Sequence, residues 1–421
     1  MNAMFEPVDL LAIVFALAVL IGCVNHLWVR LPPAIGMLLG SLVVSLLIVA
    51  SDRVFHLHVM SWFRGTLDEA HLPRIFLNAI LALLLFAGSL HVDVAELSRR
   101  RWIILLLATA SVILSTCVFG GGMWLMFGLI GAAVPLAWCI VLGAILAPTD
   151  AVVVENLLRQ VGLPPSLRAA IVGESLFNDG AGVVLFLVAL GVTQGDTLVL
   201  DHGVVVLALL REIVGGAALG FVGGWLAGIL LRRISDDGLQ LLISLTLVIG
   251  IYRVANLSEL SGPIAVVSAG LCLASPSPRI GMTPDTRTLL VGFWLLLDQL
   301  MNTLLFLLVG LQILGLVIQP IELLPVAFAI PLAVISRLFS VAVPLLLTRE
   351  RLRDKVRDMT VLTWAGLRGG ISIALALSLP ASPWRADLLV VTYGVVVFTI
   401  VVQGLTISRF LQAAYGAKTQ V

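Results

Sequence analysis

Charged side chains are scarce in this sequence: Asp, Glu, Lys and Arg together make up 12% of its 421 residues. A water-soluble domain carries about 25% charged residues and cannot cover its surface with so few. The scarcity therefore excludes a soluble globular domain of ordinary composition. The net charge of only +1, with no basic stripe along the chain, also argues against a nucleic-acid partner.

Cysteine and recognisable catalytic motifs are also nearly absent. The cysteines lie in apolar stretches with no CxxC motif or Cys/His spacing, so they predict neither a disulfide framework nor a metal cluster. They are Cys23, Cys117, Cys139 and Cys272. The chain also lacks HExxH, GxSxG and a catalytic Cys/His set, which argues against an enzyme acting in the membrane. We expect no cofactor.

Alternating ten-residue strands, the pattern of an outer-membrane barrel, are missing. Instead, 60% of the residues are hydrophobic, and apolar windows of about twenty residues recur, each long enough to span a membrane. We therefore predict an all-α polytopic membrane protein, with residues 1–421 forming a single integral membrane domain. About thirteen transmembrane segments are expected, at 8–29, 33–50, 74–91, 102–128, 136–157, 169–194, 205–231, 239–257, 262–275, 288–316, 321–347, 359–380 and 386–412. The first, which follows no basic leader, is expected to be a retained helix.

Basic residues are unevenly distributed among the connecting loops. Loops after odd-numbered segments hold seventeen and the other loops hold four. Because cytoplasmic loops are enriched in Lys and Arg, this split predicts an N-terminus outside and a C-terminus in the cytoplasm. The expected location is a bacterial inner membrane. The seventeen are Arg30, Arg99, Arg100, Arg101, Arg159, Arg168, Arg232, Arg233, Arg279, Arg287, Arg349, Arg351, Arg353, Lys355, Arg357, Arg409 and Lys418; the four are Arg53, Arg64, Arg74 and Arg385.

Two predicted segments contain a break near their middle. The fifth carries LAPTDAVVV at 146–154, and the twelfth carries GLRGGIS at 366–372. Broken helices at corresponding places in two halves are typical of transporters built from inverted repeats. We therefore predict two inverted six-helix halves with a linker helix and a short cytoplasmic tail. Their expected bounds are 1–197 and 239–412 for the halves, 198–238 for the linker and 413–421 for the tail.

Five ionisable residues fall near the middle of predicted spans, where a charge is costly to keep. They are Asp150, Glu174, Asp179, Arg337 and Arg368. Such residues face a bundle interior or a wet cavity. One interpretation is that they pair off and only hold helices together. The excess of one acid over the two arginines, beside Asn, Ser and Thr side chains, favours an ion-binding site.

The stretch GESLFNDGAG at 173–182 places polar groups at helical spacing. Glu174 and Asn178 are four residues apart, as are Ser175 and Asp179, so each pair shares a helix face. Because the two faces are adjacent, Glu174 is free to reach an arginine while the other pair lines a cavity. This stretch is therefore the first candidate for the ion site.

The helix break near Thr149 and Asp150 is the second part of the predicted site. Pro148 cannot donate a backbone hydrogen bond, so it frees a carbonyl oxygen, while the following half helix presents amides. Arg337 is the candidate partner of Glu174, and Arg368, at the second break, would offset the negative end of a half helix.

An oxygen-lined site of this kind suits a hard monovalent cation. A carboxylate that has lost its water shell also takes up a proton more readily. One site would therefore hold either a proton or a cation, and competition for it is enough to couple the two flows. The expected partners are monovalent cations, protons and the lipid bilayer.

Four motifs occur together in this chain: APTDAVVV, GESLFNDGAGVVLF, ISRLFSV and GLRGGISIALAL. Their order and spacing, with the thirteen segments, resemble the monovalent cation/proton antiporters, in particular the bacterial NhaP-type and animal sodium/proton exchanger branch. The resemblance covers nearly the whole chain. It implies an inverted-repeat fold with a core domain, a dimerisation domain, elevator-like movement of the site, and a homodimer.

The resemblance also implies roles for individual residues. Asp179 would bind the proton or cation beside a non-titrating neighbour, Glu174 would pair with Arg337, and Arg368 would balance the crossing helix ends. The residues implied to form the monovalent-cation site are Asp179, Asp150, Asn178, Ser175 and Thr149. In this branch an Asn-Asp pair goes with electroneutral exchange, with Na⁺ as the expected cation and Li⁺ or K⁺ as alternatives.

Two other classes of membrane protein remain as alternatives. A cation channel, or a transporter not coupled to protons, would also place acids within its spans. A channel is expected to show a re-entrant filter sequence or rings of acids at a pore mouth, and none is evident. We therefore predict a secondary active antiporter and not an enzyme.

Overall fold

The computed structural model describes residues 7–55, 72–150, 165–195, 202–275, 282–315, 323–347 and 352–415, and within these ranges its regular structure is helical. The helix bounds, with short π or 3₁₀ turns written η, are α1 Pro7–Val24, η1 Asn25–Val29, α2 Pro33–Phe55, α4 Leu72–His91, α5 Val94–Arg99, α6 Arg101–Ala108, α7 Ala110–Leu129, α8 Leu136–Leu146, α10 Pro165–Thr193, α11 His202–Arg233, α12 Asp237–Leu257, α13 Gly262–Ala274, α14 Pro284–Leu311, η3 Gln312–Gly315, α15 Leu323–Leu346, α16 Leu352–Trp364, α17 Gly370–Leu377, α18 Arg385–Phe398, η5 Thr399–Gln403 and α19 Gly404–Tyr415.

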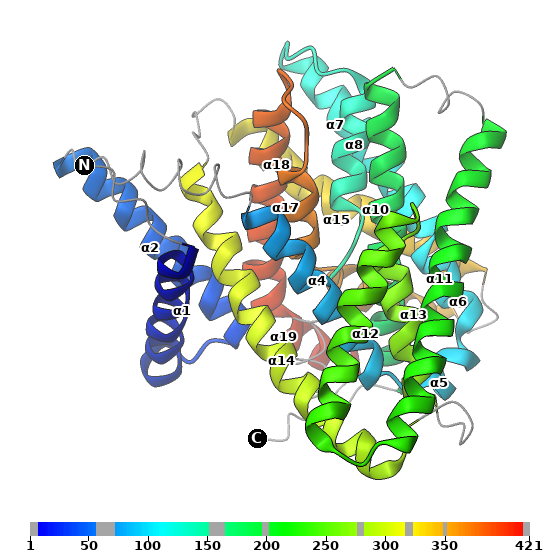
Figure 1. The fold of residues 1–421 in the computed structure, drawn as a ribbon. Helices are drawn as coiled ribbons and strands as arrows, with labels where there is room; N and C mark the ends of the chain where they lie inside the picture. The colour runs from blue at the N-terminus through cyan, green and yellow to red at the C-terminus, as the bar shows by residue number, and fades with distance from the viewer. Residues whose placement is uncertain are drawn as a thin grey trace.

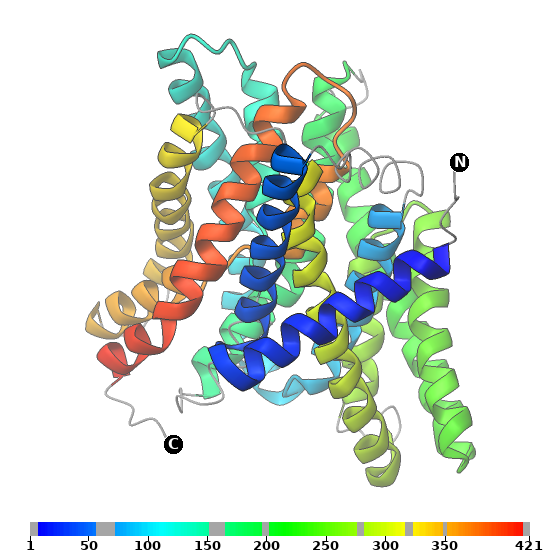
Figure 2. The ribbon, with the colours of Figure 1, turned by 90° about the vertical axis from the view of Figure 1, so that its left-hand side faces the viewer.

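The helices pack as two groups that lie side by side (Figure 1). In the first group, α14 packs on α2 and α4, and α13 packs on α4, α11 and α12. In the second group, α7 packs on α8 and α15, while α10 packs on α8 and α6. Figure 2 shows α1 running obliquely past α2 and α14, both of which it contacts.

The two groups meet along a few helices near the centre of the molecule. The contacts between them include α10 on α13, and α17 on α4 and α14. Two of these elements, α10 and α17, carry the motifs GESLFNDGAGVVLF and GISIALAL. The fold therefore brings the predicted site to the boundary between the two groups.

The helical stretches have the length and composition of membrane spans. Nine in the described ranges are long and apolar enough to cross a membrane, and α4, α8 and α13 contribute shorter apolar helices. The twelfth predicted segment is divided between α16 and α17. The all-α polytopic class is thus confirmed, whereas the count of thirteen crossings and the division into inverted halves stay predictions.

Some helices differ from the predicted segments. The fourth segment, 102–128, is two helices, with Thr109 between them at φ −119° and ψ −70°. The Thr109 hydroxyl donates to the carbonyl oxygen of Leu105 at 2.7 Å, a local bond that competes with regular helix geometry. A short helix, α5, also occupies the connection before this segment. The part of the fifth segment from 151 to 157 lies outside the described residues.

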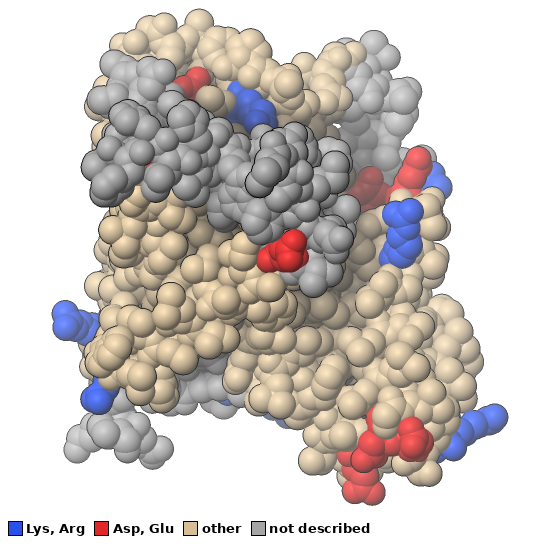
Figure 3. Space-filling view, turned by 60° about the vertical axis from the view of Figure 1, so that its left-hand side comes forward, with Lys and Arg blue, Asp and Glu red and all other residues tan. Residues whose placement is uncertain are grey.

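The surface of the described helices is largely uncharged. On the face shown in Figure 3, most of the charged side chains lie near the edges, and a broad area between them is uncharged. Large apolar side chains are exposed on the flanks of several helices, as at Val19 (63%), Leu47 (60%) and Ile249 (62%). Such a surface is stable in lipid, where the hydrocarbon tails solvate it.

Two of the basic loops predicted on the same side of the membrane lie at the same end of the molecule. In Figure 1, α5 and the turn between α11 and α12 lie at the lower end, the end at which the C-terminus is marked. Arg99 and Arg100 belong to the first of these places, and Arg232 and Arg233 to the second. This clustering is what the charge asymmetry requires, and the orientation of the chain in the membrane stays a prediction.

Helices α11 and α13 approach each other closely because glycines line their contact. A Cβ atom on Gly220 would overlap the carbonyl oxygen of Ala265 in α13, so no larger residue fits there without moving a helix. Small residues allow such close backbone approach in membrane helices. Within the predicted linker at 198–238, α11 is a continuous 32-residue helix that packs in the first group, and its role as a linker between two halves stays a prediction.

This contact gives a test of the packing. We expect Gly220→Ala to lower the free energy of unfolding by about 1–3 kcal/mol, the usual cost of overpacking. The matched control is Gly250→Ala in α12, where a Cβ would meet no atom of the described residues within 4 Å. The measurement is the thermal unfolding midpoint of the purified protein in detergent. Equal midpoints for the two variants would contradict the close contact.

Candidate ion site at two crossing helix breaks

Two helices are interrupted in the centre of the second group, and the two interruptions face each other. Helix α8 ends at Leu146, and the chain from 147 to 150 is extended or irregular; α16 ends at Trp364, and α17 begins at Gly370. The backbone N–H of Asp150 donates to the carbonyl oxygen of Leu367 at 2.7 Å. The second predicted break is therefore present, α8 ends where the first was predicted, and a backbone hydrogen bond joins the two places; residues 151–154 lie outside the described residues.

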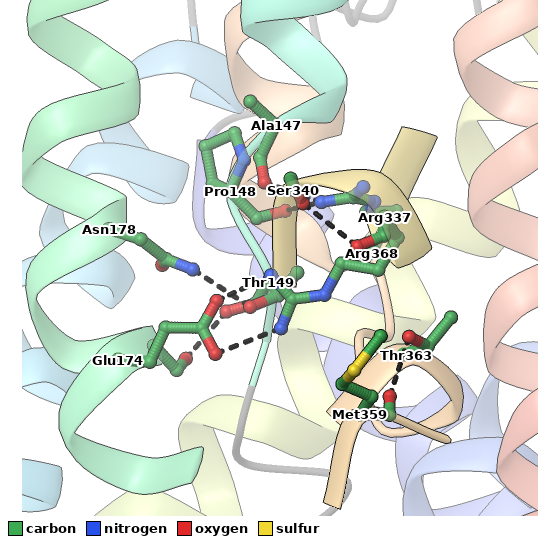
Figure 4. A network of polar contacts seen from close by, with 11 residues as sticks. Ala147, Pro148, Thr149, Glu174, Asn178, Arg337, Ser340, Met359, Thr363 and Arg368 are labelled. Atoms are coloured by element: carbon green, nitrogen blue, oxygen red, sulfur yellow. Dashed lines mark hydrogen bonds and ion pairs between the residues drawn. The ribbon is translucent and has the colours of Figure 1, made fainter. Parts of the chain in front are cut away.

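Arg368 compensates the end of α8. Its Nη1 donates to the carbonyl oxygens of Ala147 and, at 3.0 Å, Pro148 (Figure 4). The last carbonyls of a helix have no partner within the helix and carry its partial negative charge. The guanidinium, only 2% exposed, thus supplies both hydrogen bonds and an opposite charge to the interrupted helix. This is the location that the sequence predicted for Arg368.

Asp150 lies at the beginning of α17. A Cβ atom on Gly369, the residue just before that helix, would overlap the carboxylate of Asp150. The absence of a side chain at Gly369 therefore leaves room for the carboxylate beside the start of the helix. An acid at a helix N-terminus is stabilised by the partial positive charge there. Each break therefore brings a charged side chain to an exposed end of the opposite half helix.

One face of α10 holds the first break in place. The Ser175 hydroxyl donates to the carbonyl oxygen of Thr149 at 2.5 Å, and Asn178 Nδ2 donates to Thr149 Oγ1 at 2.8 Å. Figure 4 shows Asn178 reaching from α10 to the irregular chain around Thr149. These bonds satisfy polar groups that the missing helical turn leaves without helical partners.

Glu174, on the adjacent face of α10, forms a buried ion pair with Arg337 from α15. Two contacts join the groups: Arg337 Nη1 with Glu174 Oε1, and Nη2 with Oε2 at 2.9 Å (Figure 4). Their side chains are 1% and 6% exposed for Glu174 and Arg337 respectively. A planar guanidinium matches a carboxylate in this two-fold geometry. The predicted contact between the two residues is thus present.

Asp179 differs from the other charged groups. It is 6% exposed, and its Oδ1 is buried without a hydrogen-bond partner among the described residues. The neighbouring Asn178 Oδ1 is also buried without a hydrogen-bond partner among the described residues. The Asp150 carboxylate is close enough for the two charges to repel. Because both central arginines are engaged elsewhere, at Glu174 and at the α8 carbonyls, neither of them forms an ion pair with Asp179.

A cavity of about 70 Å³ lies against this carboxylate, between the two helix groups. Its polar lining comes from Asp150, Ser175 and Asp179, and its apolar lining comes from α4, α10, α14 and α17. Thr149 and Asn178 are not among the lining residues; they lie behind them and hold the break in place. Of the five predicted site residues, three therefore face the cavity and two support it.

Thr399, which supports the second break from η5, was not predicted from the sequence. The backbone N–H of Arg368 donates to Thr399 Oγ1 at 3.1 Å, so the irregular chain at 365–369 is tied to α18 and η5. A threonine in the apolar stretch VVVFTIVVQ gives no local signal of this role. The π-helical geometry at Thr399–Gln403, of a kind often found at functional sites, also leaves no mark in the sequence pattern.

The polar groups that line the cavity are oxygens, the ligands that hard cations prefer. In the part of the chain that the structure describes, no three His, Cys, Asp or Glu residues gather closely enough to hold a metal ion. Carboxylate and hydroxyl oxygens line the cavity instead. A helical membrane bundle whose buried acids lie at two crossing, interrupted helices is the architecture of a secondary transporter.

Comparisons with known proteins place the chain within that class. The family described as sodium/hydrogen exchanger, transmembrane, matches residues 13–413. The chain is 37% identical over 419 residues to the Na⁺/H⁺ antiporter NhaP of Pseudomonas aeruginosa, and the match covers 97% of this chain and 97% of that relative. It is 34% identical over 342 residues to the low-affinity Na⁺/H⁺ antiporter NhaS1 of Synechocystis, covering 79% of this chain and 63% of that relative. The chain therefore belongs to the sodium/hydrogen exchanger family.

A solved structure supports the fold. The sodium proton antiporter MjNhaP1 from Methanocaldococcus jannaschii, at pH 8, superimposes with a TM-score of 0.74. The match covers 97% of this chain and 98% of that chain, at 18% sequence identity. The two proteins thus share their arrangement of helices. At 18% sequence identity, the comparison establishes the fold and not the roles of individual side chains.

The Glu174–Arg337 pair can be tested through stability. We expect Glu174→Gln to lower the free energy of unfolding by about 3–5 kcal/mol, because it leaves the buried charge of Arg337 without its partner. The control is Glu96→Gln, which removes an ion pair with Arg99 whose side chain is 75% exposed and should cost about 1 kcal/mol or less. Thermal unfolding of both purified variants measures the difference. A Glu174→Gln protein as stable as the control would show that the pair does not hold the fold.

Proposed function

We propose that this chain is a secondary antiporter that exchanges Na⁺ for H⁺ across the membrane, with the two ions competing for Asp179. The family and the relatives named as Na⁺/H⁺ antiporters support the type of transport. The observation that carries the assignment of the site is the state of Asp179. It is a buried acid facing a cavity, and its Oδ1 has no hydrogen-bond partner among the described residues.

Charge compensation supports Asp179, rather than Glu174, as the exchanging group. Glu174 has a two-fold contact with Arg337, so a proton or cation there would have to displace a buried arginine. Asp150 lies at the N-terminus of α17, where the helix amides stabilise its charge. Asp179 is therefore the acid whose charge a reversibly bound proton or cation would neutralise.

Competition at this carboxylate couples the two flows. A cavity of about 70 Å³ holds a few water molecules or one partly dehydrated alkali ion. The oxygens of Asp179, Asp150 and Ser175 would act as ligands of that cation, replacing part of its water shell. A proton on Asp179 removes the charge that attracts the cation, so each ion excludes the other. Only the neutralised forms of the site would then cross the membrane.

We infer one cation for one proton from the identity of the neighbouring residue. Asn178 donates to Thr149 and carries no titratable group, so this position adds no second proton to the cycle. With Asp150 compensated by the N-terminus of α17, a single titrating carboxylate remains at the centre of the site. Exchange would then be electroneutral, and the membrane potential would not drive it.

We further propose that the second helix group carries the site past the first, in an alternating-access cycle. The cavity lies at the boundary between the groups, and Asp150, Ser175 and Asp179 all belong to the second group. A homodimer held by the first group, and a bacterial inner membrane with the basic loops in the cytoplasm, complete this proposal. The halves 1–197 and 239–412 would be the inverted repeats of the cycle.

The primary test is the variant Asp179→Asn. We expect it to abolish Na⁺ uptake driven by an imposed pH gradient in proteoliposomes, because the amide can neither release a proton nor hold a cation as a counter-charge. The control is Asp237→Asn, an exposed acid at the start of α12 that should leave exchange intact. Parallel runs with Li⁺ and K⁺ measure cation preference. Wild-type exchange in Asp179→Asn, or wild-type Na⁺ flux that ignores the pH gradient, would refute the proposal.

The stoichiometry has its own test in Asn178→Asp. This substitution adds a titrating group beside Asp179 and removes the donor that holds Thr149 Oγ1. We expect a changed pH profile of exchange and, with a second proton in the cycle, transport that responds to an imposed membrane potential. The measurement is Na⁺ flux with and without a potassium–valinomycin potential. A pH profile identical to that of the wild type would place Asn178 outside the cycle.

A further inference from the structure

A second, larger cavity adjoins the site. It has a volume of about 490 Å³ and lies between α10, α11, the α12–α13 turn and α17. Three residues line both cavities, namely Leu81 of α4 and Ile371 and Ala374 of α17. The two spaces are therefore neighbours, separated by an apolar boundary at these side chains.

The second cavity lies toward the end of the molecule away from the basic loops. Its lining includes Ser261 in the turn after α12 and Ser378 just after α17. Helix α12 begins at the α11–α12 turn, at the lower end in Figure 1, and runs 21 residues from there, so the turn after it lies at the far end. The charge asymmetry predicts that this end faces the outside of the cell.

The charged residues among the described lining of this cavity are both acids, Glu212 of α11 and Glu259 of the α12–α13 turn. The backbone N–H of Ser261 donates to the backbone carbonyl of Glu212 at 3.2 Å, which holds the two elements together. Glu259 adopts a left-handed conformation with φ 54°, a conformation that few non-glycine residues adopt. The two carboxylates are near enough for their charges to interact.

This arrangement has a direct electrostatic consequence. A cavity with acidic side chains and low-dielectric walls focuses the field and raises the local concentration of cations. The apolar boundary beyond it offers a cation no ligands, whereas Asp179, whose Oδ1 has no hydrogen-bond partner among the described residues, lines the cavity on the far side. A cation on this path would pass from the acidic second cavity, across the apolar boundary, to the cavity at Asp179.

We propose that in this conformation cations reach Asp179 through the second cavity, that Glu212 and Glu259 concentrate them there, and that the boundary at Leu81, Ile371 and Ala374 is the barrier they cross. This inference rests on the proposed antiport function and adds its route and the residues that determine apparent affinity. Glu212 and Glu259 act at a distance from the bound ion, so they influence its capture and not its movement across the membrane.

The first test separates capture from turnover. For the double variant Glu212→Gln/Glu259→Gln, with Na⁺ supplied on the side of the α12–α13 turn, we expect KM for Na⁺ to rise about tenfold at low ionic strength with kcat unchanged. The increase should shrink in high salt, because salt screens charges beyond about one Debye length. The control Glu96→Gln, an acid in α5 at the opposite end, should leave KM unchanged. An unchanged KM in the double variant would overturn the steering role.

The second test uses cysteine accessibility. Cys23 and Cys117 are exposed and are replaced by alanine, whereas the buried Cys139 and Cys272 stay. In this background, Ser378→Cys lines the second cavity, and Ser235→Cys in the α11–α12 turn is the control for the opposite end. We expect a membrane-impermeant thiol reagent to label the two variants from opposite sides of the membrane. Labelling of both from the same side would overturn the proposed route.

The barrier is tested by Ala374→Cys in the same background. Attachment of a methanethiosulfonate reagent to this position should block exchange, and a reductant that removes the adduct should restore it, which rules out loss of folding as the cause. Full exchange by the modified protein would overturn the route. These outcomes are separate from the proposed function itself, because the effect of Asp179→Asn on exchange is measured without any of these variants.

Discussion

The crossing of two interrupted helices is the contact on which the rest of the site depends. Each interruption exposes backbone groups inside a membrane protein, where unsatisfied polar groups are costly. The structure meets this cost by pairing the breaks: the Asp150 amide bonds to Leu367, and the Arg368 side chain bonds to the carbonyls that end α8. The positive charge of Arg368 thus lies at the C-terminal end of α8, and the negative charge of Asp150 lies at the N-terminal end of α17.

This compensation explains why two acids five residues apart on α10 behave differently. Glu174 faces Arg337 and has its charge neutralised by a permanent partner, which gives rigidity to the helices around the break. Asp179 faces the cavity, where the helix ends have already been compensated by other groups. An arginine beside Asp179 would neutralise it permanently, as Arg337 neutralises Glu174, and would leave no role for an exchanging ion in the proposed function.

The position of the cavity links the site to movement. Asp150, Ser175 and Asp179 lie within one group of helices, and the opposite wall of the cavity comes from α4 and α14 of the other group. In the proposed cycle, a shift of one group against the other would change which end of the molecule the site faces, and the hydrogen bonds at Thr149, Ser175 and Asn178 would stay within one group. The hydrogen bonds at the crossing and the boundary between the two helix groups are therefore separate features of the fold.

The sequence by itself determined the all-helical class, the places where α8 ends and where α16 and α17 separate, and the polar residues that meet there. These features follow from the length of apolar runs, from proline and glycine, and from the four-residue spacing on one helix, all of which act locally. It did not reveal the bend at Thr109, the support from Thr399, or which site residues face the cavity. Only the tertiary structure decided that Arg368 caps a helix that ends more than two hundred residues earlier, because such contacts arise from packing between distant segments and leave no local pattern.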